Sequence, residues 1–311
     1  MEGLVRMNTL KIGRDQLLVP EIGLGCMRIN GLEIDEAERL IQTALDNGIN
    51  FFDHADIYGN TEAETFFARA VQRAGIARDR MILQSKCGIR KGFFDFSKDY
   101  VLRATDGILS RLNIDHLDVL LLHRPDALME PTEVAEAFSR LKDAGKVRHF
   151  GVSNQNPGQI ALLNKYLPEP VLINQMQLSI AHCVMMDAGL NVNMHNDAGI
   201  GRDGGILEYC RLHDITIQAW SPFQYGFFEG VFIDSPLYPE LNRVMDEVAE
   251  RYAVSKTVIA IAWILRHPAR MQPIVGTTNR ARLVDIGKAS DIRLTREEWY
   301  ALYCAAGKIL P

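Results

Sequence analysis

Four side chains that can move a proton or stabilise charge follow a repeating apolar pattern. Asp53 and Lys86 each end a short apolar run, in INFFD and MILQSK, and His123 ends a third run, LDVLLLH. Tyr58 lies shortly after Asp53, in the sequence HADIYG. An apolar segment that runs straight into a charged residue packs poorly unless that end faces a functional site. We therefore expect the four side chains to converge on one rim of the fold.

The four residue types together suggest acid catalysis at a carbonyl group. A tyrosine phenol has a pKa of about 10, and a neighbouring ammonium such as that of Lys86 is expected to lower this pKa by stabilising the phenolate. Asp53 can hold Lys86 by an ion pair, and a neutral His123 can donate a hydrogen bond to a carbonyl oxygen. The set matches a general acid beside a polarised carbonyl. No side chain supplies a hydride, so a reduction needs a nicotinamide cofactor.

The elements that must position these residues repeat along the chain. From residue 22 onward, short apolar runs alternate with amphipathic stretches at helical spacing. Such alternation favours parallel strands with crossover helices, and eight repeats favour a closed (β/α)8 TIM barrel over an open sheet. The predicted strands are 22–26, 49–53, 81–86, 117–123, 148–153, 171–175, 215–219 and 272–275. The predicted helices are 34–47, 61–74, 98–112, 131–144, 158–166, 206–213, 239–252, 255–267, 280–289 and 296–306.

A short apolar pair precedes the first repeat. Residues 9–12 and 17–19, joined by Gly13-Arg14-Asp15, predict an N-terminal β-hairpin that covers the barrel bottom. No Pro- or Ser-rich linker interrupts the chain. We therefore expect residues 1–311 to form a single barrel domain, with residues 1–6 as a flexible tail.

Two segments are longer than a minimal barrel requires. Residues 176–205 are rich in Asn, Gly and Met, and residues 221–238 contain five aromatic side chains apart from Tyr238. Both follow predicted strands, and both are expected to be irregular loops. They therefore lie on the C-terminal face, where barrel enzymes keep their active sites.

Composition excludes several classes of protein. The chain has 311 residues, 47% of them hydrophobic, and a formal net charge of -5 with its basic residues dispersed. This argues against a nucleic-acid or membrane-surface partner, and no apolar run is long enough to span a bilayer. The N-terminus has no apolar core typical of a signal peptide. Five cysteines without CxxC spacing predict reduced thiols, and hence a cytoplasmic protein, which we expect to be a monomer.

The chain resembles the aldo-keto reductase family from about Thr9 to Gly307. The motifs that carry the resemblance are DHADIYG, SKCGI, LLHRPD and LKDAGKVRHFGVSN, and they resemble most a subgroup of bacterial NADP-dependent oxidoreductases. The family's catalytic Asp, Tyr, Lys and His fall on Asp53, Tyr58, Lys86 and His123. The resemblance implies reduction of an aldehyde or ketone, a small-molecule carbonyl substrate, with Tyr58 as the proton donor. It implies NADP(H) as the cofactor, with NAD(H) as the alternative.

The resemblance also implies a cofactor site. Ser153, Asn154 and Gln175 would hydrogen-bond the nicotinamide carboxamide, and Trp220 would stack on the ring where Tyr is common. Asp53 and the segment Gly25, Cys26 and Met27 would lie beside the nicotinamide, although packing is the alternative for the last two. The residues implied near the phosphates are Ser221, Pro222 and Phe223 at the pyrophosphate, Gly276, Thr277 and Thr278 at a helix start, and Arg282 at the 2′-phosphate.

Three departures from the family pattern bear on specificity. Gly276 stands where many members have Lys, so one phosphate contact is missing and the preference for NADP(H) is weakened. Arg124 follows the catalytic His where many members have a bulky aromatic residue, which predicts a more polar substrate pocket. The chain ends at Pro311, soon after its last helix, which predicts an open pocket.

Two other patterns carry little weight. A GxGxxG at Gly199, Gly201 and Gly204 follows no strand, so it is interpreted as loop rather than as a Rossmann motif. The acidic and imidazole groups of the same segment match no known metal-ligand spacing, and we expect no metal site; they are His182, Asp187, His195 and Asp197.

Two rival functions keep the barrel but change its role. One is a nicotinamide-binding regulatory subunit with little turnover, like the barrel subunits of some potassium channels. The other is an isomerase or aldolase that uses Lys86 as a Schiff base and needs no nicotinamide.

Overall fold

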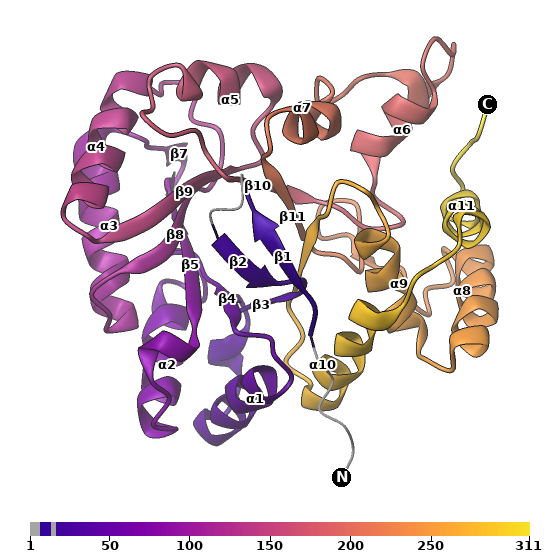
Figure 1. The fold of residues 1–311 in the computed structure, drawn as a ribbon, viewed down its shortest axis with the longest axis horizontal. Helices are drawn as coiled ribbons and strands as arrows, with labels where there is room; N and C mark the ends of the chain where they lie inside the picture. The colour runs from indigo at the N-terminus through magenta and orange to yellow at the C-terminus, as the bar shows by residue number, and fades with distance from the viewer. Residues whose placement is uncertain (1–6, 14–16) are drawn as a thin grey trace.

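Eight parallel strands close into a barrel, and they follow one another around it in chain order. The structure is a computed structural model that describes residues 7–13 and 17–311 (Figure 1). The strands are β3 (Gly23–Gly25), β4 (Phe51–Asp53), β5 (Ile82–Cys87), β8 (Leu117–Leu122), β9 (Val147–Ser153), β10 (Ile173–Gln177), β11 (Thr216–Trp220) and β14 (Gln272–Val275). The predicted (β/α)8 TIM barrel is confirmed.

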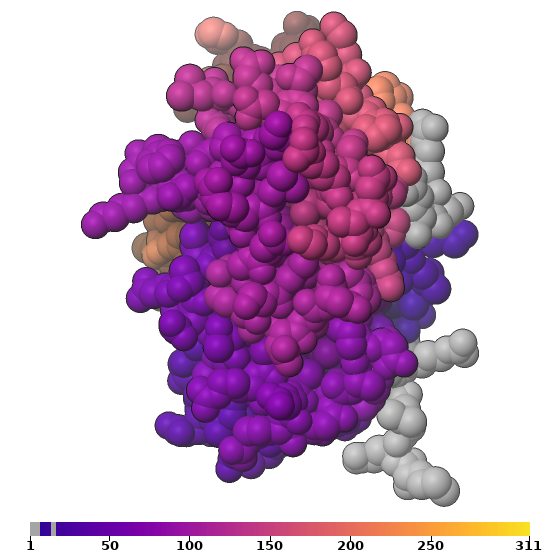
Figure 2. All heavy atoms as spheres, turned by 90° about the vertical axis from the view of Figure 1, so that its left-hand side faces the viewer, coloured from indigo at the N-terminus to yellow at the C-terminus, as the bar shows by residue number. Residues whose placement is uncertain are grey.

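Helices surround the barrel because each presents one apolar stripe to it. In α1 the buried positions are Ala37, Leu40, Ile41 and Ala44, which share one helical face. The helices are α1 (Ile34–Asp46), α2 (Glu62–Arg73), α3 (Lys98–Leu112), α4 (Pro131–Asp143), α5 (Pro157–Asn164), α6 (Val184–Leu190), α7 (Ile206–Leu212), α8 (Pro239–Tyr252), α9 (Lys256–Leu265), α10 (Arg280–Gly287) and α11 (Arg296–Ala305). Figure 2 shows the side of the molecule on which α2, α3 and α4 form the outer layer. Within the described residues, no helix has the length and apolar character needed to cross a membrane.

The N-terminal hairpin closes one end of the barrel. Strands β1 (Thr9–Ile12) and β2 (Leu17–Pro20) pair antiparallel, and they lie across the barrel opening in Figure 1. Leu10, Ile12 and Val19 share a buried cluster with barrel residues such as Phe51 and Val119. The predicted hairpin at the bottom is therefore confirmed, whereas the predicted tail at 1–6 and the hairpin residues Arg14 and Asp15 lie outside the described residues.

The two long loops on the C-terminal face are more regular than expected. The segment 176–205 includes the end of β10, the helix α6 and a 3-10 turn, Asp197–Gly199. In helix α6, Asp187 is buried and accepts hydrogen bonds from Tyr303 Oη, at 2.9 Å, and from Lys308 Nζ, at 2.8 Å. The prediction of an irregular loop was wrong there, since a contact with the distant C-terminal segment stabilises this helix.

Two small hairpins lie in the loops of the C-terminal face. The segment 221–238 contains β12 (Gln224–Tyr225) paired with β13 (Gly230–Val231), so it too is not wholly irregular. A similar hairpin, β6 (Ile89–Arg90) with β7 (Phe93–Phe94), follows β5 and was not predicted. Two-residue strands carry too little periodicity for a sequence pattern to identify them.

A pair of tryptophans joins α9 to α11. Trp263 and Trp299 stack with ring centroids 4.7 Å apart. Each indole N–H donates to the other residue's backbone carbonyl, at 3.1 Å from Trp263 and 3.0 Å from Trp299. Both tryptophans are buried and belong to the hydrophobic core.

We predict that Trp263→Phe lowers the free energy of unfolding by about 1–3 kcal/mol, because it removes a buried hydrogen bond and part of the stacked area. Urea titration followed by circular dichroism measures the change. Trp299→Phe should have a comparable effect, and the double variant should lose less than the sum of the two because the rings contact each other. Strictly additive losses would contradict a coupled pair.

Candidate active site

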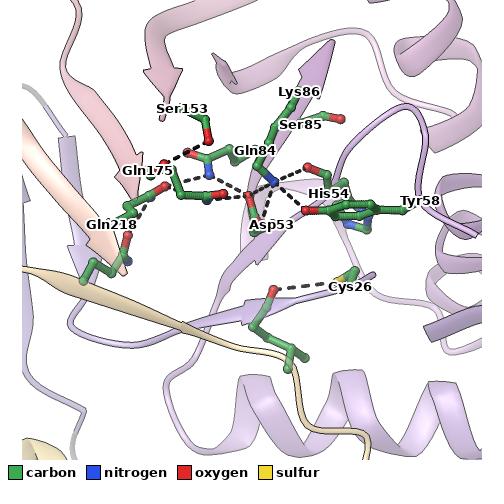
Figure 3. Close-up of polar contacts among 12 residues, drawn as sticks. Cys26, Asp53, His54, Tyr58, Gln84, Ser85, Lys86, Ser153, Gln175 and Gln218 are labelled. Carbon is green, nitrogen blue, oxygen red and sulfur yellow. Dashed lines mark hydrogen bonds and ion pairs between the residues drawn. The ribbon is translucent and has the colours of Figure 1, made fainter. Parts of the chain in front are cut away.

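The Lys86 ammonium is fully buried at the centre of the site. Its Nζ donates to both carboxylate oxygens of Asp53, at 2.7 and 2.8 Å, and to the His54 carbonyl at 2.7 Å. The Tyr58 hydroxyl lies 3.2 Å from the same nitrogen (Figure 3). The register of β4 on β5 places Asp53 opposite Gln84, and strand alternation turns both Gln84 and Lys86 to the interior. Three of the four predicted catalytic residues therefore meet at one ammonium.

The loop that carries Tyr58 turns sharply behind it. Gly59, Asn60 and Thr61 all have positive φ angles, of 57°, 55° and 75°. The positive φ favours glycine at Gly59, where a Cβ would lie 2.3 Å from the end of the Asn30 side chain and would displace it. The turn returns the chain to α2 and leaves the phenol facing Lys86.

The protonation states of the phenol and the ammonium follow from burial and from their mutual contact. Burial raises the pKa of Tyr58, and the Lys86 ammonium lowers it by less, so the pKa lies above its ordinary value. Lys86 therefore lowers the pKa of Tyr58, as expected from the sequence, but burial, which the sequence did not show, has the larger effect. Burial lowers the pKa of Lys86, but Asp53 and Tyr58 more than offset this and raise it overall. At neutral pH the phenol keeps its proton and the amine keeps its charge.

His123 completes the rim from the end of β8. Its ring meets the Tyr58 ring edge-on, with centroids 6.0 Å apart. Burial, with the nearby Lys86 and Arg124 charges, holds the pKa of His123 well below its ordinary value. The imidazole is therefore neutral and can donate one hydrogen bond, as the sequence analysis expected of a group that orients a carbonyl oxygen.

Asp53 lies on a layer of glutamines, of which only Gln175 was predicted from the sequence as a site residue. Gln84 Nε2 donates to Asp53 at 2.6 Å and to Gln218 at 2.8 Å, and Gln175 Nε2 donates to the same two residues at 3.1 and 3.0 Å. Gln218 donates to Gln272 at 2.8 Å, and Gln272 donates to the Pro20 carbonyl of the hairpin at 2.7 Å. The only signal was the recurrence of Gln at inward positions of strands otherwise rich in branched residues.

The residues expected around a nicotinamide carboxamide form one hydrogen-bonded chain. Trp220 Nε1 donates to Asn154 Oδ1 at 3.2 Å, Asn154 Nδ2 donates to Ser153 Oγ at 2.7 Å, and Ser153 Oγ donates to the Gln175 carbonyl at 2.9 Å. Asn154 has a positive φ of 57°. The structure brings the four together, but the Gln175 amide N–H points to Asp53 and Gln218.

The segment after β3 lies against the other side of Asp53. Gly25 pairs with Asp53 in the barrel, and the Cys26 amide donates to the Asp53 carbonyl at 2.8 Å. The Cys26 side chain is buried, and burial raises the pKa of its thiol well above its ordinary value. Met27 is exposed by 41%, so of these two side chains it is the more accessible.

The loops after β11 and β14 hold the residues expected near the phosphates. After β11, Ser221 has a positive φ of 52°, Pro222 is buried and Phe223 packs on the core. After β14, Gly276, Thr277 and Thr278 precede α10, whose N-cap is Asn279 and accepts from the Arg282 amide at 3.0 Å.

Arg28 is a second cation at this end that the sequence analysis missed. Its guanidinium hydrogen-bonds the carbonyl of Gly276, the position where many family members have Lys. Its exposed side chain comes from the first loop of the barrel rather than from the last. A local sequence motif cannot predict a contact between residues that follow the first and the last strand of the barrel.

An aromatic cluster lies at the mouth of the site. Phe228 stacks on Trp220 with centroids 6.0 Å apart, and Phe227 meets the same indole edge-on at 6.3 Å. The Arg124 guanidinium lies over the rings of Trp220 and Phe227 at 5.6 and 5.4 Å. The Trp220 ring therefore already contacts protein side chains. The family resemblance implied only that a nicotinamide would stack on it.

The acidic and glycine patterns of residues 182–204 lie in the segment between β10 and α7. Asp187 is bound by Tyr303 and Lys308, and the described residues contain no group of three metal-ligating side chains. Gly199 lies in the 3-10 turn, and Gly201 and Gly204 follow no strand. The predicted absence of a Rossmann motif therefore agrees with the local backbone.

The comparisons with known proteins decide the family. The Aldo/keto reductase family profile matches residues 21–303. The chain belongs to the aldo-keto reductase family. It is 35% identical to an uncharacterized oxidoreductase, YcsN, of Bacillus subtilis, over 90% of this chain and 92% of the relative. It is also 35% identical to a 6-dehydroglucose reductase of Novosphingobium aromaticivorans, over 97% and 96%.

The fold comparison agrees with this family. A crystal structure of a thermostable aldo-keto reductase with the inhibitor epalrestat matches with a TM-score of 0.78, covering 96% of this chain and 100% of that one at 24% identity. A probable voltage-gated potassium channel β subunit of rice is 26% identical over 92% of each chain. The family resemblance expected from the motifs is confirmed, and the chain is an aldo-keto reductase-type oxidoreductase.

His54 adjoins the site but faces away from it. It is buried against Phe67, with ring centroids 4.5 Å apart, and neither ring nitrogen has a partner among the described residues. Burial and the Lys86 charge lower its pKa from 6.5 to about 3. A histidine with a depressed folded-state pKa contributes stability above its ordinary pKa, and this is lost as the pH falls toward the folded value.

We predict that between about pH 7 and about pH 5 the wild type loses about 2 kcal/mol of stability that His54→Leu does not lose. Urea midpoints at the two pH values give the difference, and comparing each protein with itself cancels the packing change. His195→Leu, at an exposed loop histidine, is the matched control. An equal pH dependence in wild type and His54→Leu would show that His54 takes up its proton without unfolding the protein.

Proposed function

We propose that this protein is an NADP(H)-dependent reductase of aldehydes or ketones in which Tyr58 is the general acid. The observation that carries the proposal is the contact of Tyr58 Oη with Lys86 Nζ, at 3.2 Å, while Asp53 holds the same ammonium at 2.7 and 2.8 Å. The phenol is protonated, next to a charge that stabilises the phenolate left after proton transfer.

The residues divide the work on a bound carbonyl. Tyr58 donates its proton to the carbonyl oxygen as that oxygen gains negative charge. Neutral His123 donates a hydrogen bond to the same oxygen and orients it. Lys86 stabilises the phenolate, and Asp53 keeps Lys86 in place and compensates its charge.

The residues present fit a nicotinamide dinucleotide. A bound nicotinamide would supply the hydride, which no side chain can provide. Ser153, Asn154 and Gln175 offer hydroxyl and amide groups on the side where Trp220 closes the chain of hydrogen bonds. Gly276 has no Cβ, so a phosphate group could approach its backbone closely. Gly25, Cys26 and Met27 would border the ring, and Ser221, Pro222 and Phe223 the pyrophosphate.

The preference for NADP(H) over NAD(H) rests on two arginines. Arg282 lies in the first turn of α10, and Arg28 hydrogen-bonds the Gly276 carbonyl from the loop after the neighbouring strand β3. Thr277 and Thr278 would add hydroxyl and backbone donors at the start of the same helix. Arg28 supplies a cation close to the place of the Lys that many family members have, and this supports binding of the 2′-phosphate.

The Schiff-base alternative is disfavoured by the charge state of Lys86. A nucleophilic lysine needs a lowered pKa, but Asp53 and Tyr58 raise the pKa of Lys86. The regulatory-subunit alternative predicts cofactor binding with little turnover on any aldehyde. We also propose a cytoplasmic monomer, supported by cysteines that are all unpaired in the described residues.

We predict that Tyr58→Phe lowers kcat for an aldehyde such as 4-nitrobenzaldehyde by more than about 100-fold, because the proton donor is lost. NADPH affinity, measured by fluorescence titration, should stay within about threefold because the hydroxyl contacts Lys86 rather than a cofactor-holding group. Tyr166→Phe, at an exposed position in the turn after α5, is the control.

Measurements of turnover, NADPH binding and borohydride trapping together separate the alternatives. Near-normal turnover by Tyr58→Phe would remove Tyr58 from the role of proton donor. NADPH binding without turnover by the wild type on a broad aldehyde panel would favour the regulatory subunit. Borohydride trapping of a carbonyl on Lys86, without NADPH binding, would favour the Schiff-base enzyme.

A further inference from the structure

Arg124 carries a positive charge at the mouth of the site that no acidic group compensates. It directly follows His123 at the end of β8 and is half-buried. Within the part of the chain that the structure describes, its guanidinium makes no ion pair and no hydrogen bond. Other partly buried guanidinium groups differ in this respect, since Arg78 pairs with Asp118 and Arg111 pairs with Glu64. An unpaired, partly desolvated guanidinium is costly unless a ligand pairs with it.

The aromatic cluster fixes the position of this guanidinium. Its carbon lies 5.6 Å from the Trp220 ring centre and 5.4 Å from that of Phe227. Trp220 is itself held by its hydrogen bond to Asn154. A guanidinium that stacks on ring faces keeps the N–H groups at its edge free to donate hydrogen bonds to a planar partner such as a carboxylate. Phe227 and Phe228 are 62% and 51% exposed, so apolar surface flanks this donor.

Arg124 carries the uncompensated positive charge of the site, because the other groups there are either paired or neutral. The Lys86 ammonium is compensated by Asp53, and His123 is neutral. The nearby Arg124 charge contributes to lowering the pKa of His123, and burial lowers the pKa of Arg124 itself. A substrate with a negative group would therefore enter a site with one excess positive charge.

We propose that Arg124 binds a carboxylate carried by the carbonyl substrate, so that the enzyme prefers oxo acids and carboxylate-bearing aldehydes. This proposal rests on the reductase function proposed above. Tyr58 and His123 bind the carbonyl oxygen, and Arg124 is adjacent to His123, so the carboxylate belongs to the same molecule, a few bonds away. A single guanidinium fork matches one carboxylate, whereas a phosphate dianion would favour a second free cation. The other buried cation of the site, Lys86, is already compensated.

The test compares two aldehydes that differ mainly in charge, 4-carboxybenzaldehyde and methyl 4-formylbenzoate. We expect the wild type to have a kcat/KM at least about tenfold higher for the carboxylate. Arg124→Gln should lower this ratio by about tenfold or more, chiefly through KM, because uniform binding of the charge is lost. Arg124→Lys, which keeps the charge without the planar fork, should retain an intermediate ratio. Arg103→Gln, at an exposed arginine of α3, is the control and should leave the ratio unchanged.

A binding measurement without turnover completes the test. Calorimetric titration with 4-carboxybenzyl alcohol, with and without NADPH, should show binding to the wild type that weakens in Arg124→Gln. An unchanged kcat/KM ratio in Arg124→Gln would mean that Arg124 only packs the aromatic cluster, and the proposal would fail while the reductase function stands. Preference of the wild type for the methyl ester, or for neutral D-glyceraldehyde, would also overturn it. Failure of the wild type to reduce any of these aldehydes would overturn the reductase function and this proposal together.

Discussion

The buried ion pair between Lys86 and Asp53 is the constraint around which the site is built. An ammonium removed from water is tolerated only when a counter-charge and hydrogen bonds replace its hydration. Lys86 has both carboxylate oxygens, the His54 carbonyl and the Tyr58 hydroxyl as neighbours, so its protons are satisfied. Removing one partner of such a pair typically costs about 3–5 kcal/mol. The pair therefore fixes β4 and β5 relative to each other and places the phenol on a compensated charge.

The glutamine layer extends this compensation through the barrel. The interior of such barrels is usually filled by branched apolar residues, yet here Gln84 and Gln175 donate to Asp53, while Gln218 and Gln272 continue the chain to the hairpin. These amides satisfy the Asp53 carboxylate without adding charge. The apolar filling is shifted to the lower layer, where Phe51, Val119 and Ile274 pack against the hairpin. The hairpin thus closes both the apolar layer and, through Pro20, the polar one.

The sequence predicted the fold well because the barrel repeats one local pattern. Strand and helix positions follow from periodicity, and the ends of β4, β5 and β8 could be identified from Asp53, Lys86 and His123 without knowledge of any contact. Features that depend on distant contacts were missed. Helix α6 is stabilised by Asp187 binding Tyr303, the glutamine layer requires the register of strands far apart in the chain, and Arg28 reaches Gly276 across the first and last strands. The effect of Lys86 on the pKa of Tyr58 could be predicted, because the lysine is visible in the sequence, whereas the extent of burial, which raises this pKa overall, could not.

The groups proposed to carry out the reaction and the groups proposed to select the substrate lie in different parts of the molecule. The groups proposed to move or stabilise the proton belong to strand ends, or in the case of Tyr58 to a turn adjacent to one, and buried hydrogen bonds hold them. Rigid elements suit this role, because acid catalysis requires hydrogen-bond geometry to within a fraction of an ångström. The groups that would meet the rest of a substrate, Phe227 and Phe228, lie on the exposed segment after β11. Arg124 lies at the boundary between these parts, since it adjoins His123 along the chain and packs against Trp220 and Phe227 in space. A change in substrate charge preference can therefore arise at this boundary without disturbing the buried ion pair that supports the reaction.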